Sequence, residues 1–154
     1  PTGVLAQDVG HWCAQELEDE ILRVGPENVA AFIFEPVVGA AGGVVPAPEG
    51  YARLLREICS RHGVLMIADE IQTGLARTGE MLACDNEQVR PDILILGNTL
   101  SGGVLPVSAV LCDDEIMMTI QPGEHGSTYG GNPLACKVAM AAAAETGLPP
   151  KVLK

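Results

Sequence analysis

The chain has 154 residues and a net charge of -11, and 47% of its residues are hydrophobic while only 3% are aromatic. So acidic a chain lacks the positive surface that nucleic acids and anionic membranes require, and its uncharged apolar runs are too short to cross a bilayer. The length suffices for one domain with a core of Val, Leu, Ile, Ala and Met side chains.

The first half of the sequence predicts two pairs of a helix followed by a strand. Apolar residues recur at helical spacing in 8–26 and again in 48–63, and glycines stand near the end of both segments. The segments 28–36 and 64–70 are continuous apolar runs, as in strands that are buried on both faces. The second of these strands ends in two adjacent acidic residues.

The second half predicts further strands at 92–96 and 107–112, and then a short helix at 113–120. Acidic residues stand in the first turn of that helix, where the helix dipole favours them. A last helix is predicted at 131–145, with Asn132 as its N-cap.

Strands that alternate with helices predict an α/β fold, in which a mainly parallel sheet has helices on both faces. Ligands of such sheets bind beyond the carboxyl ends of the strands. Glu35, Asp69 and Asn98 each stand where a predicted strand ends, so they are the first candidates for a functional site.

Asp69 follows a buried strand, so its carboxylate needs a hydrogen-bond or charge partner. Two interpretations are open. The carboxylate either caps or ion-pairs with the following turn, or it meets a cationic ring nitrogen of a ligand. In the second case Ile71 can pack under the ring, and Gln72 can form a hydrogen bond with a ring substituent.

A polar, glycine-rich loop at 124–133 leads into the last helix. Its backbone N–H groups, Ser127, Thr128 and the helix N-terminus are suited to a phosphate group, and the alternative is ordinary turn and cap chemistry. The glycine-rich segment 35–43 lacks the GxGxxG and GK[ST] spacings of nucleotide loops, so its glycines are expected to let the backbone turn.

Five cysteines are scattered along the chain without a CxxC pair or the spacing of zinc ligands: Cys13, Cys59, Cys84, Cys112 and Cys136. No metal site is expected from them. An odd number of scattered thiols fits a reducing compartment, such as the cytoplasm or the mitochondrial matrix.

The run "ADEIQTGLARTGEMLACDNEQVRPDILILGNTLSGGVLPVSAVLCDDEIMMTIQPGEHGSTYGGNPLACKVAMAA", residues 68–142, resembles the class III aminotransferases, and within them the ornithine aminotransferases. Residues 10–67 look more like members that use omega-amino acids with pyruvate, as the run "AAFIFEPVVGAAGGVVPAPEGYARLLREICSRHGVLMIADE", residues 30–70, indicates. The resemblance covers residues 10–145. It implies the fold type I of enzymes that depend on pyridoxal 5'-phosphate (PLP).

The resemblance also implies residue roles. Asp69 would pair with the pyridine nitrogen of PLP and keep it protonated, so that the ring serves as an electron sink. Ile71 would pack on the ring face, Gln72 would lie near the phenolic oxygen, and Glu35 would be a supporting carboxylate.

The resemblance implies a homodimer with shared active sites. Ser127 and Thr128 would then reach the phosphate of the cofactor in the neighbouring subunit. The partners implied are a small-molecule amino donor, either an amine or an omega-amino acid of ornithine-like or beta-alanine-like type, and a keto-acid acceptor. Ala40 stands where ornithine-type members carry an acid, which counts against ornithine itself.

Asn98 departs from the family pattern at its catalytic centre. The family has a lysine there, 29 residues after Asp69, and this lysine forms the Schiff base with PLP. An amide is not a nucleophile, so the chain is expected to be impaired. The alternatives are a catalytically dead pseudoenzyme or assembly subunit that keeps the fold, and an engineered variant in which the lysine was replaced.

The resemblance implies that residues 1–154 form part of a PLP-binding large domain. The N-terminal segment and the C-terminal small domain of the family have no counterpart in this sequence, which begins with "PTGVLAQ" and without Met.

Overall fold

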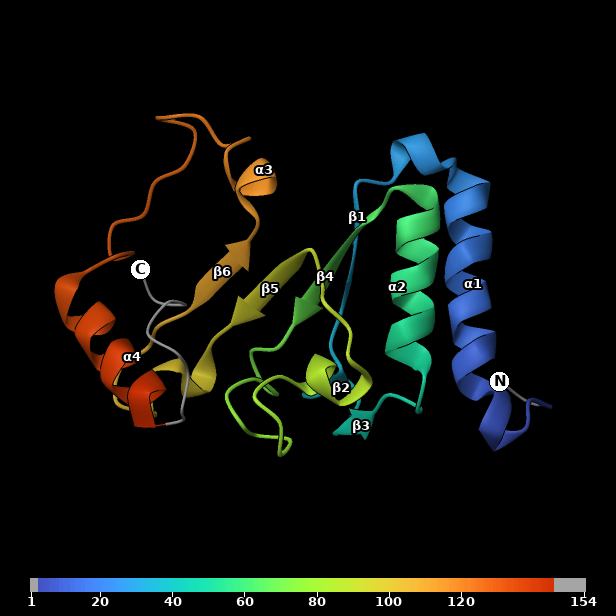
Figure 1. Cartoon of the computed structure of the whole chain (residues 1–154), viewed down its shortest axis with the longest axis horizontal. Coiled ribbons are helices and arrows are strands. Elements are labelled where there is room, and N and C mark those ends of the chain that lie inside the picture. The colour runs from blue at the N-terminus through green and yellow to red at the C-terminus, as the bar shows by residue number, and fades with distance from the viewer. Residues whose placement is uncertain (1–2, 146–154) are drawn as a thin grey trace.

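The computed structural model describes residues 3–145 and shows a mixed α/β fold (Figure 1). Its helices are α1 (Val9–Val24), α2 (Tyr51–His62), α3 (Asp114–Met117) and α4 (Pro133–Glu145). Its main sheet consists of β1 (Ala31–Phe34), β4 (Leu65–Asp69), β5 (Ile93–Leu96) and β6 (Ala109–Cys112). The predicted fold class is confirmed, since this sheet is mostly parallel and is packed with helices.

The sheet has the strand order β1-β4-β5-β6. The first three strands are parallel, and β6 runs antiparallel to β5. The carboxyl ends of adjacent parallel strands meet at one edge, so the segments that follow β1, β4 and β5 lie side by side. Glu35 follows β1, Asp69 ends β4, and Asn98 follows shortly after β5.

A small hairpin that the sequence analysis did not predict follows β1. It pairs β2 (Val37–Val38) with β3 (Val45–Pro46) in antiparallel fashion. The turn between them contains two residues with positive φ, Gly43 at 75° and Val44 at 63°. The glycine-rich segment therefore does turn the backbone, as expected.

The helix ends follow the signals in the sequence. Gly63 has a φ of 68° and its N–H donates to the carbonyl oxygen of Cys59, which ends α2. Asn132 caps α4, because its Oδ1 accepts a hydrogen bond of 2.8 Å from the N–H of Ala135. The predicted helix at 113–120 is shorter than expected, since α3 ends at Met117.

The core lies on one face of the sheet. Its larger cluster joins α1 and α2 to β1 and β4, with Leu55, Cys59, Met66 and Ala68 fully buried. In Figure 1, α2 lies between α1 and the sheet. A smaller cluster joins Leu96 of β5 to α4 and to the turns beside it. Side chains alternate along each strand, so both clusters use the same face.

The opposite face of the sheet is apolar but less covered. Ile33 of β1 is 54% exposed and Val110 of β6 is 56% exposed. The helices of residues 3–145 pack against the first face in both core clusters. Helices were expected on both faces, and in the described part of the chain the second face has no such cover.

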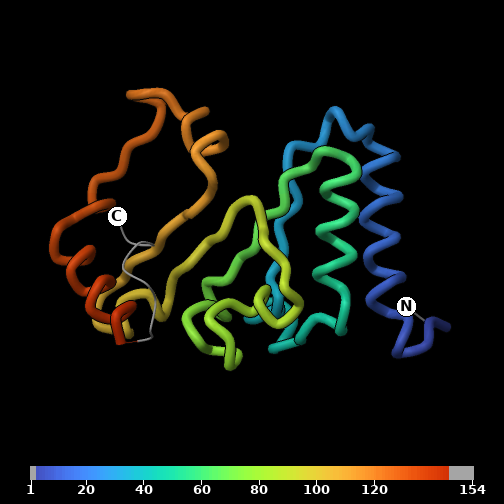
Figure 2. Tube along the Cα trace, viewed as in Figure 1, coloured from blue at the N-terminus to red at the C-terminus, as the bar shows by residue number. Residues whose placement is uncertain are grey.

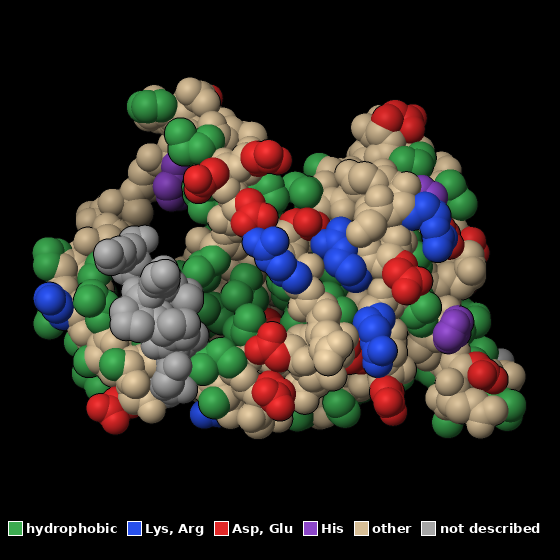
Figure 3. Space-filling model, in the orientation of Figure 1, with side chains coloured by type: hydrophobic (Ala, Val, Ile, Leu, Met, Phe, Trp, Pro, Cys, Tyr) green, Lys and Arg blue, Asp and Glu red, His purple; other side chains and the backbone are tan. Residues whose placement is uncertain are grey.

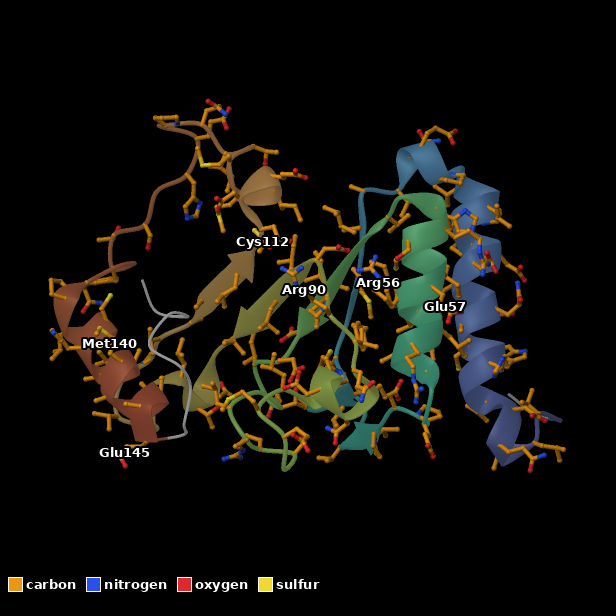
Figure 4. All side chains as sticks on the ribbon, viewed as in Figure 1. Arg56, Glu57, Arg90, Cys112, Met140 and Glu145 are labelled. Atoms are coloured by element: carbon orange, nitrogen blue, oxygen red, sulfur yellow. The ribbon has the colours of Figure 1, made fainter. Side chains whose placement is uncertain are left out.

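An ion pair fastens α2 to the sheet. Arg56 reaches from α2 toward the strands (Figure 4), and its guanidinium group lies 2.7 Å from Asp92 Oδ2. The same carboxylate oxygen accepts a 2.7 Å hydrogen bond from the N–H of Met66 in β4. Asp92 therefore ties α2 and the start of β5 to the second residue of β4.

The chain between α3 and α4 makes a wide excursion away from the sheet (Figure 2). Every residue from 118 to 131 in it is exposed. Among the described residues, none of the helices is long and apolar enough to cross a membrane. The face shown in Figure 3 carries acidic and basic side chains close together.

Candidate functional site

A cavity of about 840 Å³ opens at the edge where β4 and β5 end. Its walls are the turn after β4, the end of β5, the loop before β6, and the start of α4 with the loop that precedes it. Three residues predicted for the site line this cavity: Ile71, Asn98 and Ser127. The other four lie outside its lining: Glu35, Asp69, Gln72 and Thr128.

Asn98 begins a short 3₁₀ helix, η4 (Asn98–Ser101), directly after β5. Its φ is 30°, in the left-handed range that Asn tolerates better than most residues with a side chain. The hydroxyl of the next residue, Thr99, donates a 3.1 Å hydrogen bond to the carbonyl oxygen of Gly74. This contact fixes the segment around residue 98 to the turn that follows β4.

The two carboxylate oxygens of Asp69 differ in their hydrogen bonding. Its Oδ1 accepts a 3.1 Å hydrogen bond from the N–H of Ile71, which is the turn cap considered as one interpretation. Among residues 3–145 its second oxygen has no hydrogen-bond or ion-pair partner, and the side chain is only partly buried. Asp69 can therefore cap the turn and still meet a cationic group.

Glu70 is, in contrast, a structural carboxylate. It is 1% exposed and accepts three hydrogen bonds, from Thr73 Oγ1 at 2.8 Å and from the N–H groups of Ala83 at 2.7 Å and Cys84 at 2.9 Å. It thus holds the start of a second 3₁₀ helix, η3 (Ala83–Glu87), against the end of β4. Burial, reinforced by the nearby Glu70 carboxylate, raises the pKa of the Cys84 thiol far above its usual value.

Glu35 and Gln72 are linked through one glycine. Glu35 Oε2 accepts a 3.0 Å hydrogen bond from the N–H of Gly39. A Cβ atom at Gly39 would lie 3.2 Å from Gln72 Nε2, so the backbone of this loop rests on the Gln72 side chain. Sequence reasoning missed Gly39, because no local pattern in the sequence shows which side chain it faces.

Gly97, directly after β5, makes a similar close approach to Ile71. A Cβ atom at Gly97 would lie 3.0 Å from Ile71 Cγ2. Both residues line the cavity. The close approach brings the end of β5 and the turn after β4 together just before Asn98.

The two hydroxyl residues of the loop before α4 differ in position. Ser127 Oγ accepts a 2.9 Å hydrogen bond from the N–H of Gly130, so it serves the turn chemistry that was the alternative to phosphate binding. It also lines the cavity of its own chain, whereas Thr128 is exposed and does not line it. The Ser127 hydroxyl can still donate to an anion near the N-terminus of α4.

These residues fit the chemical groups of PLP. The free oxygen of Asp69 suits a protonated pyridine nitrogen, Ile71 offers an apolar contact for a flat ring, and Ser127 lies near a helix N-terminus suited to a phosphate. The fit fails at Asn98, which offers an amide where a covalent bond to the cofactor needs an amine.

Most of the chain matches one protein family in sequence. The family model described as "Aminotransferase class-III" matches residues 3–146. The chain is 70% identical over 115 residues to the mitochondrial ornithine aminotransferase of Rattus norvegicus, and this match covers 75% of the chain and 26% of the rat protein.

Solved structures agree with the sequence matches. The ornithine aminotransferase of Toxoplasma gondii superposes with a TM-score of 0.83 at 46% identity, over 94% of this chain and 32% of that one. An (S)-enantioselective omega-transaminase from Thermomicrobium roseum gives a TM-score of 0.86 at 38% identity, over 94% of this chain and 33% of that one. The chain thus spans between a quarter and a third of the length of these proteins.

The match to the family model includes every residue of the candidate site. Another structure of the T. gondii enzyme has PLP in its active site at partial occupancy. The chain therefore belongs to the class III aminotransferases, a family of PLP-dependent enzymes.

Proposed function

We propose that this chain is part of the PLP-binding large domain of an aminotransferase that moves an amino group from an amine or omega-amino acid to a keto acid. The observation that carries the proposal is that Ile71 and Asn98 line one cavity where the adjacent strands β4 and β5 end, with Asp69 at the end of β4 two residues before Ile71. When bound, PLP supplies an electron sink for the bonds of the amino carbon.

Each residue of the proposed site has a separate role. The free carboxylate oxygen of Asp69 holds the pyridine nitrogen in its protonated form. Ile71 packs on the ring, and Gln72 donates a hydrogen bond to the phenolic oxygen. Glu35 contributes through the loop that it fixes at Gly39.

Asn98 makes the chain as it stands an impaired catalyst. In the family the side chain at this position both bonds to the cofactor and moves a proton of the substrate, and an amide does neither. The rival function is that of a pseudoenzyme or assembly subunit that keeps the fold, and an engineered replacement of the lysine is a third origin for the same sequence. Restoring the lysine distinguishes a site that is otherwise competent from one that is not.

We also propose that the chain works as a homodimer in a reducing compartment. Apolar side chains are exposed on the excursion and on α4, with Met118 at 70%, Tyr129 at 82% and Leu134 at 66%. Burying them against a second copy would bring Ser127 and Thr128 toward a neighbouring site. The amino donor is ornithine-like or beta-alanine-like, and Ala40 favours a donor other than ornithine.

A titration of the 154-residue chain with PLP tests this function. Binding in an asymmetric site should induce circular dichroism in the absorption band of the cofactor, and Asp69→Asn should weaken it. Sedimentation of the same samples reports the oligomeric state. A folded chain on which PLP shows no induced signal at millimolar concentration would rule out the proposed site.

A further inference from the structure

Two glycines stand directly against the two side chains that the proposed function places on the cofactor ring. The Cβ of an alanine at Gly97 would lie 3.0 Å from Ile71 Cγ2 and 3.3 Å from Ile71 Cγ1. The Cβ of an alanine at Gly39 would lie 3.2 Å from Gln72 Nε2 and 3.3 Å from Gln72 Cδ. Real Cβ atoms rarely make contacts this short, so either substitution displaces a neighbour.

The requirement for glycine is steric at both positions. Gly97 has a φ of -162°, which is extended backbone open to any residue, and Gly39 does not have a left-handed φ. The absent side chain therefore serves close approach and not a special backbone conformation. An alanine at either position should fold, at the cost of moving Ile71 or Gln72.

The neighbours of the two glycines are held in place. Gly97 immediately precedes η4, which Thr99 fastens to Gly74 with a hydrogen bond of 3.1 Å. Gly39 is held by its N–H donating to Glu35 Oε2 at 3.0 Å. Because both backbones are fixed, the adjacent side chains have to move when a methyl group is added.

We propose that Gly97 and Gly39 are positioning residues, which hold Ile71 and Gln72 at the distance that a flat aromatic cofactor requires. This inference rests on the proposed function. Ile71 and Gly97 line the same cavity, so a methyl group at Gly97 pushes Ile71 into the space of the ring. A methyl group at Gly39 turns the Gln72 amide away from the atom to which it donates.

The test compares PLP affinity and induced circular dichroism in the chain and its variants. Gly97→Ala should lower the affinity at least about fivefold, as expected for overpacking a tight contact. Gly10→Ala is the matched control, because its Cβ would also be tightly placed, 3.3 Å from Pro48 Cβ, but between α1 and the segment before α2. Gly10→Ala should leave PLP affinity unchanged.

A second substitution separates positioning from general damage. Ile71→Ala removes the two atoms that would lie within 3.3 Å of an alanine Cβ at residue 97. The double variant Gly97→Ala/Ile71→Ala should therefore bind PLP no worse than Ile71→Ala alone. In the same way, Gly39→Ala should weaken binding in the unsubstituted chain but have no effect once Gln72 is replaced by alanine. The exposed Gln72 side chain can move without unfolding the loop, so the Gly39 pair remains measurable if Gly97→Ala fails to fold.

The outcomes are distinct. Normal PLP affinity in folded Gly97→Ala and Gly39→Ala would overturn the inference and leave the proposed function standing. The same holds if each alanine still lowers PLP affinity after Ile71 or Gln72 has been replaced by alanine. Absence of PLP binding in the unsubstituted chain would remove the proposed function, and this inference with it.

Discussion

Asp69 and Glu70 are consecutive residues at the end of β4, and their carboxylates are used in opposite ways. Glu70 is buried and accepts three hydrogen bonds, whereas Asp69 accepts one and keeps an oxygen without a partner in the described part of the chain. The pair therefore separates a group that holds the fold from a group that is available to a ligand.

Glu70→Gln should lower the free energy of unfolding by about 2–4 kcal/mol, because an amide cannot accept all three hydrogen bonds that the carboxylate accepts. Urea denaturation measures this loss. Asp69→Asn is the control at the neighbouring position and should change the stability by much less. Equal destabilisation by the two changes would contradict the assignment of Glu70 as the structural carboxylate.

Asp69→Asn should weaken PLP binding about 10- to 150-fold, the value of a charge-assisted hydrogen bond of roughly 1.5–3 kcal/mol. Equilibrium titration of the folded variant gives the affinity. Asp69→Glu keeps the charge but moves it, so it should bind better than Asp69→Asn. An unchanged affinity in Asp69→Asn would show that the carboxylate does not contact the cofactor.

Thr99→Val should destabilise the chain by about 0.5–1.5 kcal/mol, since it removes the donor to the Gly74 carbonyl oxygen while keeping the shape of the side chain. Thr99→Ser keeps the hydroxyl and should recover most of the loss. Denaturant unfolding of the two variants provides the comparison. If serine and valine behave alike, the hydrogen bond does not fasten η4 to the turn.

Stability at acidic pH should depend on Glu18. Hydrogen bonds from His62 at 2.7 Å and from Arg61 lower the pKa of Glu18 from its usual 4.5. A pKa lower in the folded chain stabilises the fold above the unfolded value, and that contribution is lost as the pH falls through the folded pKa. Glu18→Gln should therefore lose less stability than the unsubstituted chain as the pH falls below the usual Glu pKa and through the lowered pKa of Glu18.

The control for this experiment is Glu16→Gln on the same helix, because Glu16 is exposed and forms none of the ion pairs found in residues 3–145. It should keep the acid sensitivity of the parent chain. If the stability of Glu18→Gln and that of the parent chain fall equally as the pH is lowered, Glu18 is not the source of the acid sensitivity.

The sequence was sufficient to predict the main elements, because apolar periodicity and glycine stops mark α1, α2 and α4 without tertiary information. It also predicted that Glu35, Asp69 and Asn98 lie at one edge of the sheet, because the strands that precede them, β1, β4 and β5, are parallel neighbours. The hairpin of β2 and β3 was missed because its strands have only two residues each. The different fates of Asp69 and Glu70 depend on contacts with η3, which no local pattern reveals.

We propose that residue 98 occupies the position from which this family binds its cofactor covalently. The direct measurement is borohydride treatment of the Asn98→Lys variant with PLP, followed by peptide mass spectrometry. We expect a stable PLP adduct at residue 98, which is absent from the unsubstituted chain and reduced by Asp69→Asn. A folded Asn98→Lys chain with no adduct at residue 98, or with equal adducts on Lys137, Lys151 and Lys154, would contradict it.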